Sequence, residues 1–283
     1  HGDSAKSMLF LRNYAMERFL ERLSASKYRN CFILKGGMLI SAMVGIDSRA
    51  TMDIDTTLRN YPLNCESAEQ IVRQIADVEI DDKISFVIKK TEEIMEDSEY
   101  QGVRLSLDAY LDKTRIPLKI DISTGDVITP CEISFSYQLM FENRTIPLLA
   151  YPPETVLAEK LETILSRGEA NTRLRDFYDV YILQREDFVV TPDALRYALL
   201  ATCRTRGHED LLHTYASILD GVRQSGAMRT QWMKYQTDFD YAAGITWDTV
   251  LDTVETLCMK TLDDHAFGDE LPQEESQFEM HLL

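Results

Sequence analysis

In the first half of the chain, apolar side chains recur at two spacings, one typical of helices and one typical of strands. Residues 8–29 carry apolar side chains at roughly helical spacing, which predicts a helix, and residues 65–77 predict a second one. The short apolar run CFIL (31–34) is followed by two glycines and by MLISAMVG (38–45), which can form a short helix. In TMDIDTT (51–57) every second residue is polar or charged, which is the strand period.

Two further segments alternate in the same way. RLSLDAYL (104–111) and IPLKIDIST (116–124) each place their large apolar residues on one face and polar residues on the other. The turn-like DKTR between them predicts a hairpin. After YPPE (151–154) the apolar stripes are almost wholly helical. We therefore predict an α+β domain over residues 1–150 and a helical C-terminal domain over residues 151–283.

Composition narrows the possible functions. The chain has 30 Lys and Arg against 47 Asp and Glu, a net charge of -17, which disfavours a generic coating role on nucleic acid but leaves room for a local basic patch. Part of this acidity lies in residues 263–279, a tail that we expect to be solvated or disordered.

Cysteine and apolar patterns bear on the compartment. Five widely spaced cysteines without a C-x-x-C pair, and histidines without H-E-x-x-H, indicate reduced thiols and disfavour a disulfide framework or a zinc site. The chain has no run of eighteen apolar residues, and HGDSAKSMLF lacks the pattern of a signal peptide. We expect a cytoplasmic protein with no membrane partner.

Three aspartates on predicted strands suggest a metal centre. Asp53 and Asp55 are two residues apart and therefore share a strand face, where unpaired carboxylates are costly. Mg²⁺ would remove that conflict, because it prefers oxygen ligands and keeps sites for substrate phosphates. Asp121 adds a third carboxylate, and three aspartates can hold two metal ions. The alternatives are a solvated acidic edge for the D-x-D and a salt bridge from Asp121 to Lys119 or Arg104.

The glycine pair before these aspartates suggests a phosphate site. Gly36 and Gly37 would let the backbone approach a phosphate at a helix N-terminus. A Gly-Gly pair alone usually marks only a turn. Its position sixteen residues ahead of the D-x-D makes the signal more specific.

The order G-G, D-x-D and a later lone aspartate resembles the nucleotidyltransferase fold shared with DNA polymerase β. The chain is similar to the AbiEii/AbiGii toxin family of bacterial toxin–antitoxin and abortive-infection systems, which includes the MenT toxins. The resemblance rests on five blocks: LKGGMLI (34–40), RATMDIDTTL (49–58), LKIDIS (118–123), YPPETVLAEKLETIL (151–165) and RLRDFYDVYIL (173–183). The family usually has Thr or Ser shortly after the glycines, where this chain has Met38-Leu39, so only the backbone contact to phosphate is expected here.

The resemblance implies further site residues. Lys160 would hold the nucleoside triphosphate, as a point charge suits phosphate; the alternative is a surface lysine paired with Glu159 or Glu162. Asp176 would match an essential aspartate of the family, which orients Lys160 or an arginine or acts as a base. Asp179 lies on the same helix face and is a candidate nucleotide-binding residue. The alternative for this block is a helix-dipole and ion-pair role.

Arg49, just before the D-x-D, would neutralise phosphate, against the alternative of a surface arginine. The resemblance also implies NTP and Mg²⁺ as co-substrate and cofactor, with two ions held by Asp53, Asp55 and Asp121. Asp121 would in addition activate the acceptor hydroxyl.

The function implied is a growth-arresting toxin, neutralised by a cognate antitoxin, that transfers NMP to RNA, most simply to the 3′ end of tRNA. A basic patch could contact that RNA; its candidates are Arg173, Arg175, Arg204, Arg206 and Lys234. Two alternatives remain open: a nucleotidyltransferase that modifies a small cationic antibiotic or a protein, and an inactive nucleotide-binding module.

Overall fold

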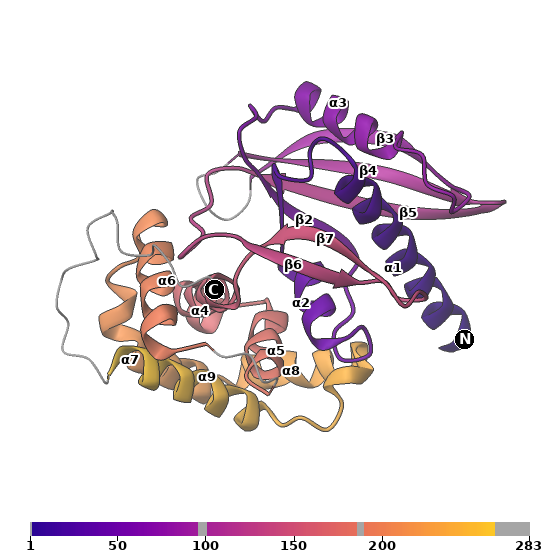
Figure 1. Cartoon of the computed structure of the whole chain (residues 1–283). Helices are drawn as coiled ribbons and strands as arrows, with labels where there is room; N and C mark the ends of the chain where they lie inside the picture. Colours follow the sequence, from indigo (N-terminus) through magenta and orange to yellow (C-terminus); the bar gives the residue numbers. More distant parts are fainter. Residues whose placement is uncertain (1, 96–100, 186–189, 264–283) are drawn as a thin grey trace.

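The computed structural model describes residues 2–95, 101–185 and 190–263, and the acidic tail lies almost wholly outside these residues (Figure 1). The helix of the first segment is α1 (Gly2–Ala25). The strands of the described residues are β1 (Phe32–Lys35), β2 (Asp53–Leu58), β3 (Ile84–Met95), β4 (Gln101–Leu111), β5 (Thr114–Ser123), β6 (Ile133–Gln138) and β7 (Thr145–Ala150). The remaining α-helices are α2 (Gly36–Val44), α3 (Cys65–Ala76), α4 (Pro153–Arg167), α5 (Leu174–Leu183), α6 (Pro192–Thr205), α7 (Leu211–Gln224), α8 (Gly226–Asp238) and α9 (Trp247–Leu262).

The described strands form one mixed sheet in the order β3-β4-β5-β2-β1-β7-β6. The β2–β5 and β1–β7 pairs are parallel, and the other neighbours are antiparallel. The predicted α+β class, with a mixed sheet followed by helices, is confirmed, and so is the hairpin of β4 and β5. Strands β3, β6 and β7 were not predicted from the pattern.

The strand alternation decides which face of the sheet is apolar. Ile54, Ile120 and Leu105 lie in register on β2, β5 and β4, and all three are fully buried. Helices α1 and α3 pack on one face of the sheet (Figure 1). The alternate positions of the same strands carry the charged residues. The sheet therefore has one face for the core and one face for polar groups.

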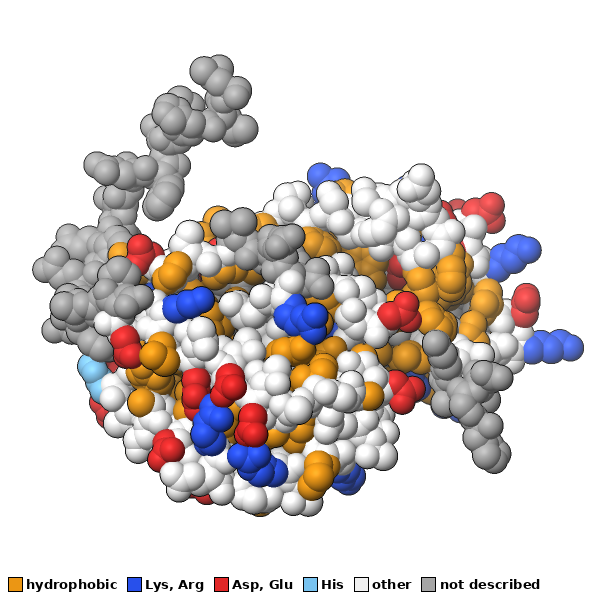
Figure 2. Space-filling model, turned by 90° about the horizontal axis from the view of Figure 1, so that it is seen from below, with side chains coloured by type: hydrophobic (Ala, Val, Ile, Leu, Met, Phe, Trp, Pro, Cys, Tyr) orange, Lys and Arg blue, Asp and Glu red, His pale blue; other side chains and the backbone are white. Residues whose placement is uncertain are grey.

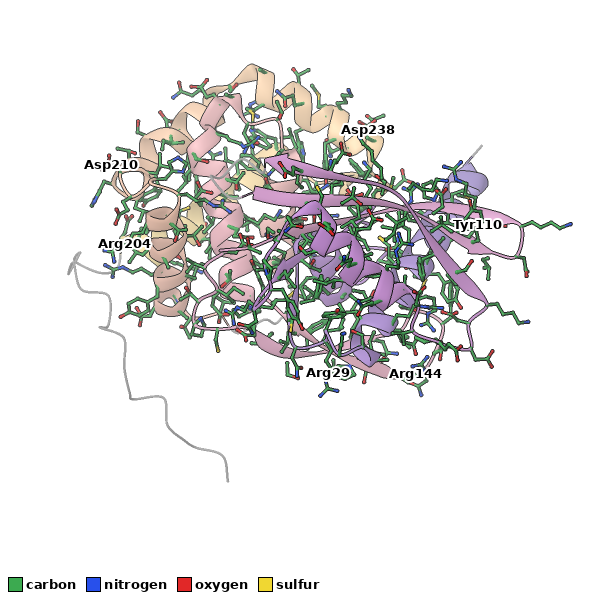
Figure 3. All side chains as sticks on the ribbon, turned by 90° about the horizontal axis from the view of Figure 1, so that it is seen from above. Arg29, Tyr110, Arg144, Arg204, Asp210 and Asp238 are labelled. Atoms are coloured by element: carbon green, nitrogen blue, oxygen red, sulfur yellow. The ribbon has the colours of Figure 1, made fainter. Side chains whose placement is uncertain are left out.

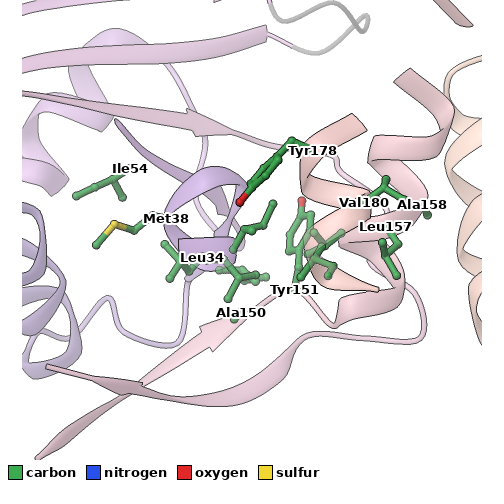
Figure 4. Close-up of a cluster of buried hydrophobic side chains, with 14 of the residues drawn as sticks. Leu34, Met38, Ile54, Ala150, Tyr151, Leu157, Ala158, Tyr178 and Val180 are labelled. Carbon is green, nitrogen blue, oxygen red and sulfur yellow. The ribbon is translucent and has the colours of Figure 1, made fainter. Parts of the chain in front are cut away.

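A buried cluster joins the sheet to the helices that follow it. Figure 4 shows side chains from β1, α2, β2 and β7 next to side chains of α4 and α5. The labelled members are Leu34, Met38, Ile54, Ala150, Tyr151, Leu157, Ala158, Tyr178 and Val180. Tyr178 also donates a hydrogen bond of 2.6 Å from its hydroxyl to the Ser48 carbonyl. The two predicted domains thus share a packed boundary, and the division at residue 150 stays a prediction.

The surface shows mixed charge. On the face drawn in Figure 2, blue and red side chains are interspersed and no large area has a single sign. Among the described residues, none of the helices combines the length and the apolar character needed to cross a membrane.

Candidate active site

The three predicted aspartates come together on the polar face of the sheet. Asp55 of β2 lies in register with Asp121 of the parallel neighbour β5, and Asp53 is two residues earlier on β2. Asp121 is buried, whereas Asp53 and Asp55 are half-buried. Residues in register on neighbouring strands point to the same face. The β2–β5 pairing, which the sequence alone does not specify, therefore places the carboxylates side by side.

Gly36 and Gly37 lie directly against this group. Helix α2 begins at Gly36, right after β1, with no side-chain cap at its N-terminus. The Gly37 N–H donates to Asp55 Oδ2 over 3.3 Å. Gly36 has a φ of 63°, and a Cβ atom there would lie 2.3 Å from Asp55 Oδ2. Glycine is therefore required at position 36 for conformation and for space, and the Gly37 N–H at the start of α2 faces the Asp55 carboxylate.

Asp121 has a basic partner on the next strand. Arg104 of β4 is in register with Asp121, and its guanidinium donates from Nε to Oδ1 over 2.8 Å and from Nη2 to Oδ2 over 2.6 Å. The salt bridge weighed as an alternative for Asp121 is therefore present. It involves Arg104, whereas Lys119 lies in register with Asp53. Both oxygens of Asp121 accept hydrogen bonds from one arginine.

Helix α5 connects the sheet to Lys160. Asp176 accepts from Lys160 Nζ at Oδ1 over 2.6 Å, and Asp179 Oδ2 is 3.3 Å from the same nitrogen. Asp179 also accepts from Arg49 Nε at Oδ1 over 2.6 Å. Lys160 is thus not paired with Glu159 or Glu162 in the way that the surface alternative requires. Arg49 is buried, so the surface alternative for this arginine is also wrong.

Burial and neighbouring charges shift the pKa values of this network. Burial would lower the pKa of Lys160, but Asp176 and Asp179 raise it above its usual value, so Lys160 stays charged. Burial would raise the pKa of Asp179, but Arg49 and Lys160 lower it. Asp176 Oδ2 is buried and has no hydrogen-bond partner among the described residues, which leaves an acceptor beside the Lys160 ammonium.

The pKa of Asp53 is raised, whereas that of Asp179 is lowered. Burial raises the pKa of Asp53 above the ordinary value of 3.8, and Asp121 raises it further, although Lys119 and Arg104 lower it. The folded chain therefore holds the charge of Asp53 at a cost in free energy. Perturbed carboxylates of this kind gather at functional sites.

Most of these residues line one cleft, which has a volume of about 1220 Å³. Of the predicted site residues, Gly36, Gly37, Arg49, Asp53, Asp55, Asp121, Lys160 and Asp176 line it. Asp179 lies behind Lys160 and is fully buried. Among the described residues, nine Lys or Arg side chains and seven Asp or Glu side chains line the cleft, in a chain whose net charge is -17. The cleft therefore differs from the rest of the protein and suits an anionic ligand.

The predicted RNA patch divides into two parts. Arg173, Arg175, Arg206 and Lys234 line the cleft. Arg204 pairs with Glu209 and lies at the outer edge of the helical part in Figure 3.

Lys35, Glu162 and His208, which the sequence did not assign to the site, also line the cleft. Arg206 bonds to the buried Glu162, which His208 contacts from Nδ1 over 2.7 Å. Lys35, just before the glycines, is 3.0 Å from Asp126. Only its position beside Gly36 could have pointed to Lys35, and no local signal identifies the Glu162 cluster.

The donor set fits Mg²⁺ in part. Among the described residues, no group of three or more His, Cys, Asp or Glu side chains is arranged to hold a metal ion. Asp53 and Asp55 remain as two carboxylates on one strand face, and the pKa of Asp53 is raised chiefly by burial. Mg²⁺ is often held by one or two carboxylates together with substrate phosphates. The pair fits that mode, in which the nucleotide completes the ligand set.

Comparison with known proteins assigns the chain to a family. A sequence model described as the nucleotidyl transferase AbiEii toxin, type IV toxin–antitoxin system, matches residues 18–253. The chain belongs to this AbiEii family. The predicted family is therefore confirmed, and the chain is a nucleotidyltransferase. An AbiEii-type system implies an NTP substrate and an antitoxin partner.

One solved structure, with a TM-score of 0.50, shares the fold, and two others are less similar. A nucleotidyltransferase candidate from H. pylori is 14% identical, with a TM-score of 0.50 over 92% of this chain and 98% of that one. JHP933 from Helicobacter pylori is 14% identical, with a TM-score of 0.49 over 90% and 94% of the two chains. An antigenic nucleotidyltransferase-like protein from Paracoccidioides brasiliensis is 12% identical, with a TM-score of 0.38 over 66% and 83%. No curated protein matches the AbiEii-family chain.

Proposed function

We propose that this AbiEii-family toxin transfers NMP from an NTP to an RNA acceptor, the 3′ end of tRNA, in a Mg²⁺-dependent reaction. The observation that carries the proposal is the cleft itself, where a carboxylate pair, an uncapped helix N-terminus and Lys160 meet among nine basic side chains. Both substrates are polyanions, and this lining is the part of an acidic chain that can receive them. A cytoplasmic location follows from the proposed tRNA acceptor.

The metal would be held by Asp53 and Asp55. Bound Mg²⁺ would lower the pKa of the attacking hydroxyl and neutralise the leaving pyrophosphate. The N–H groups of Gly36 and Gly37 would bind the phosphates next to this pair, the Gly37 N–H in exchange for its contact with Asp55. The predicted second ion and the predicted role of Asp121 in activating the acceptor hydroxyl stay proposals, and Arg104 holds both oxygens of that carboxylate.

Lys160 would bind the triphosphate from helix α4. Asp176 would orient its ammonium through the 2.6 Å hydrogen bond. Asp179 binds Lys160 and Arg49 together, which fixes the position of α4 against the segment that enters β2. We therefore assign Asp179 and Arg49 to positioning, and their direct contact with nucleotide stays a prediction.

The size of the cleft supports two substrates. Ligand pockets for single small molecules are roughly 300–1000 Å³, and this cleft is larger, at about 1220 Å³. Arg173, Arg175, Arg206 and Lys234 line it and are placed to contact an RNA end. A cationic antibiotic as acceptor would meet these side chains as repulsive charges, so the lining favours RNA over that alternative.

The test is transfer of label from each α-³²P-NTP, with Mg²⁺, into total tRNA. Asp53→Ala is the inactive control, and Asp81→Ala, an exposed carboxylate outside the cleft, is the matched control. We expect label in tRNA with the parent and with Asp81→Ala, and none with Asp53→Ala. No label from any of the four nucleotides would refute tRNA as the acceptor and shift the reaction to a protein or a small molecule.

A further inference from the structure

Arg104 is a cleft residue that neither the sequence motifs nor the family match assigns. It comes from β4, one strand beyond the carboxylates, and it lines the cleft together with Asp53, Asp55 and Asp121. Its side chain is 35% exposed, whereas that of Asp121 is 9% exposed. The guanidinium therefore reaches the open cleft, and the carboxylate that it contacts lies deeper.

Arg104 and Asp121 differ in the hydrogen-bonding groups that remain available after they have bonded to each other. An arginine has five N–H donors in a rigid planar fork. Asp121 accepts from two of them, and within the described residues Arg104 makes no other hydrogen bond. A fork held on one side by a carboxylate presents its other N–H groups in fixed directions. Asp121, in contrast, already accepts at both oxygens.

Carboxylates from three strands surround the Arg104 guanidinium: Asp121 of β5, Asp53 of β2 and Glu92 of β3. Asp53 lies close enough for each charge to shift the pKa of the other. Glu92 is opposite Arg104 on β3, where it pairs with Lys90 over 2.6 Å and its charge also acts on Arg104. Arg104 thus stands beside the proposed metal pair, where the phosphates of a substrate would be delivered.

We propose that Arg104 binds a substrate phosphate and that Asp121 is the positioning residue that orients it. The inference rests on the proposed function, because it requires a phosphate-bearing substrate in this cleft. It gives Asp121 a role through Arg104 in place of direct metal ligation. A bidentate arginine recognises a phosphate with a geometry that lysine does not reproduce.

The experiment compares the parent with Arg104→Gln, Arg104→Lys, Asp121→Asn and the double variant Arg104→Gln/Asp121→Asn. For each, titration calorimetry gives the dissociation constants of Mn²⁺ alone and of a non-hydrolysable NTP with Mg²⁺, and filter binding gives that of tRNA. Arg115→Gln is the matched control, because Arg115 forms a 2.9 Å pair with Asp108 across the same two strands but does not line the cleft.

We expect Arg104→Gln to weaken NTP binding about 10- to 100-fold, the range for loss of a charged hydrogen bond, and to leave Mn²⁺ affinity unchanged. Asp121→Asn should weaken NTP binding in the same direction, and the double variant should be no worse than Arg104→Gln alone. Arg104→Lys should not restore the parent affinity. Weakening of tRNA binding instead of NTP binding would place the phosphate on the acceptor.

Three results would overturn the inference. Loss of Mn²⁺ binding in Asp121→Asn, with NTP affinity intact in Arg104→Gln, would make Asp121 a metal ligand and Arg104 only its counter-ion. Unchanged NTP and tRNA affinities in Arg104→Gln, together with a melting temperature lowered as in Arg115→Gln, would make the pair structural. Failure of the parent to bind Mg-NTP would instead refute the proposed function, and with it the inference.

Discussion

Replacement of Gly36 by alanine tests how closely the glycine pair and the carboxylates are fitted. The new Cβ would lie 2.3 Å from Asp55 Oδ2 and 2.8 Å from its Cβ and Cγ. Ordinary van der Waals contact begins at 3.4 Å, so Asp55 or the start of α2 must move by about 1 Å. A displacement of that size at a catalytic group can cost about 10²-fold in rate. The positive φ adds about 1–2 kcal/mol of backbone strain.

Gly45→Ala is the matched control. Gly45 ends the same helix, has a φ of 89°, and would place a Cβ with nothing within 4 Å. Its backbone penalty is also about 1–3 kcal/mol, but it does not touch the carboxylates. Gly36→Ala combines backbone strain with the clash against Asp55, whereas Gly45→Ala has the strain alone, so both should lose stability and only Gly36→Ala should lose activity.

The assay combines thermal unfolding with steady-state nucleotide transfer. We expect both variants to melt a few degrees lower, at about 2–4 °C for each kcal/mol. Only Gly36→Ala should lose about 10²-fold in kcat/KM. Equal activity in the two variants, or full activity in Gly36→Ala, would refute the argument that Gly36 keeps space for Asp55.

Three further variants test the network. Lys160→Ala should weaken NTP binding at least 10-fold through loss of a phosphate contact. The control Lys260→Ala, at an exposed lysine, should leave NTP affinity unchanged. Equal NTP affinities of the two variants by calorimetry would show that Lys160 does not bind the triphosphate. Asp53→Asn should raise the melting temperature of the metal-free protein at pH 7, since a raised folded pKa means that stability falls as pH rises above about 3.8. That gain should shrink towards pH 4, and a lower melting temperature at pH 7 would contradict the pKa direction. Asp179→Asn should cost about 3–5 kcal/mol by breaking a buried ion pair, read as a denaturant midpoint, and an unchanged midpoint would mean that its bonds to Arg49 and Lys160 contribute little.

The residues of the carboxylate site could be predicted because each carries a local signal. The alternation of residues 51–57 identifies β2, and a charged residue at every second position of a buried strand needs an explanation. Gly36-Gly37 similarly marks the start of α2. What local patterns could not supply is the pairing of β2 with β5, because parallel register depends on contacts that are distant in sequence.

The partners of the charged residues were predicted less well. Asp121 was expected to hold metal, with a salt bridge as the alternative, and the structure shows that salt bridge. Arg49 was expected to meet phosphate or solvent, and it is buried against Asp179 on a helix far along the chain. Side-chain pairing of this kind is decided by tertiary packing, so a sequence shows the charges but not which of them meet.

The failure to predict strands β3, β6 and β7 has a different cause. Strand β3 contains ISFVIKKTEEIM, where the alternation ends in a run of charged residues on an exposed edge. Strands β6 and β7 are only six residues each, and β7 contains a proline, which weakens the strand signal.

The central claim is that Asp53, Asp55, Gly36, Gly37 and Lys160 form one Mg-NTP site, and the most direct measurement is the melting temperature with and without saturating Mg-NTP. Mg-NTP at a free concentration of 100 times its Kd should stabilise the parent by about 2.7 kcal/mol. This corresponds to a rise of several degrees in melting temperature, at about 2–4 °C per kcal/mol. Asp53→Ala should show no rise with Mg-NTP, and Asp81→Ala should match the parent. An unmoved melting temperature in the parent, or an equal rise in Asp53→Ala, would contradict the account.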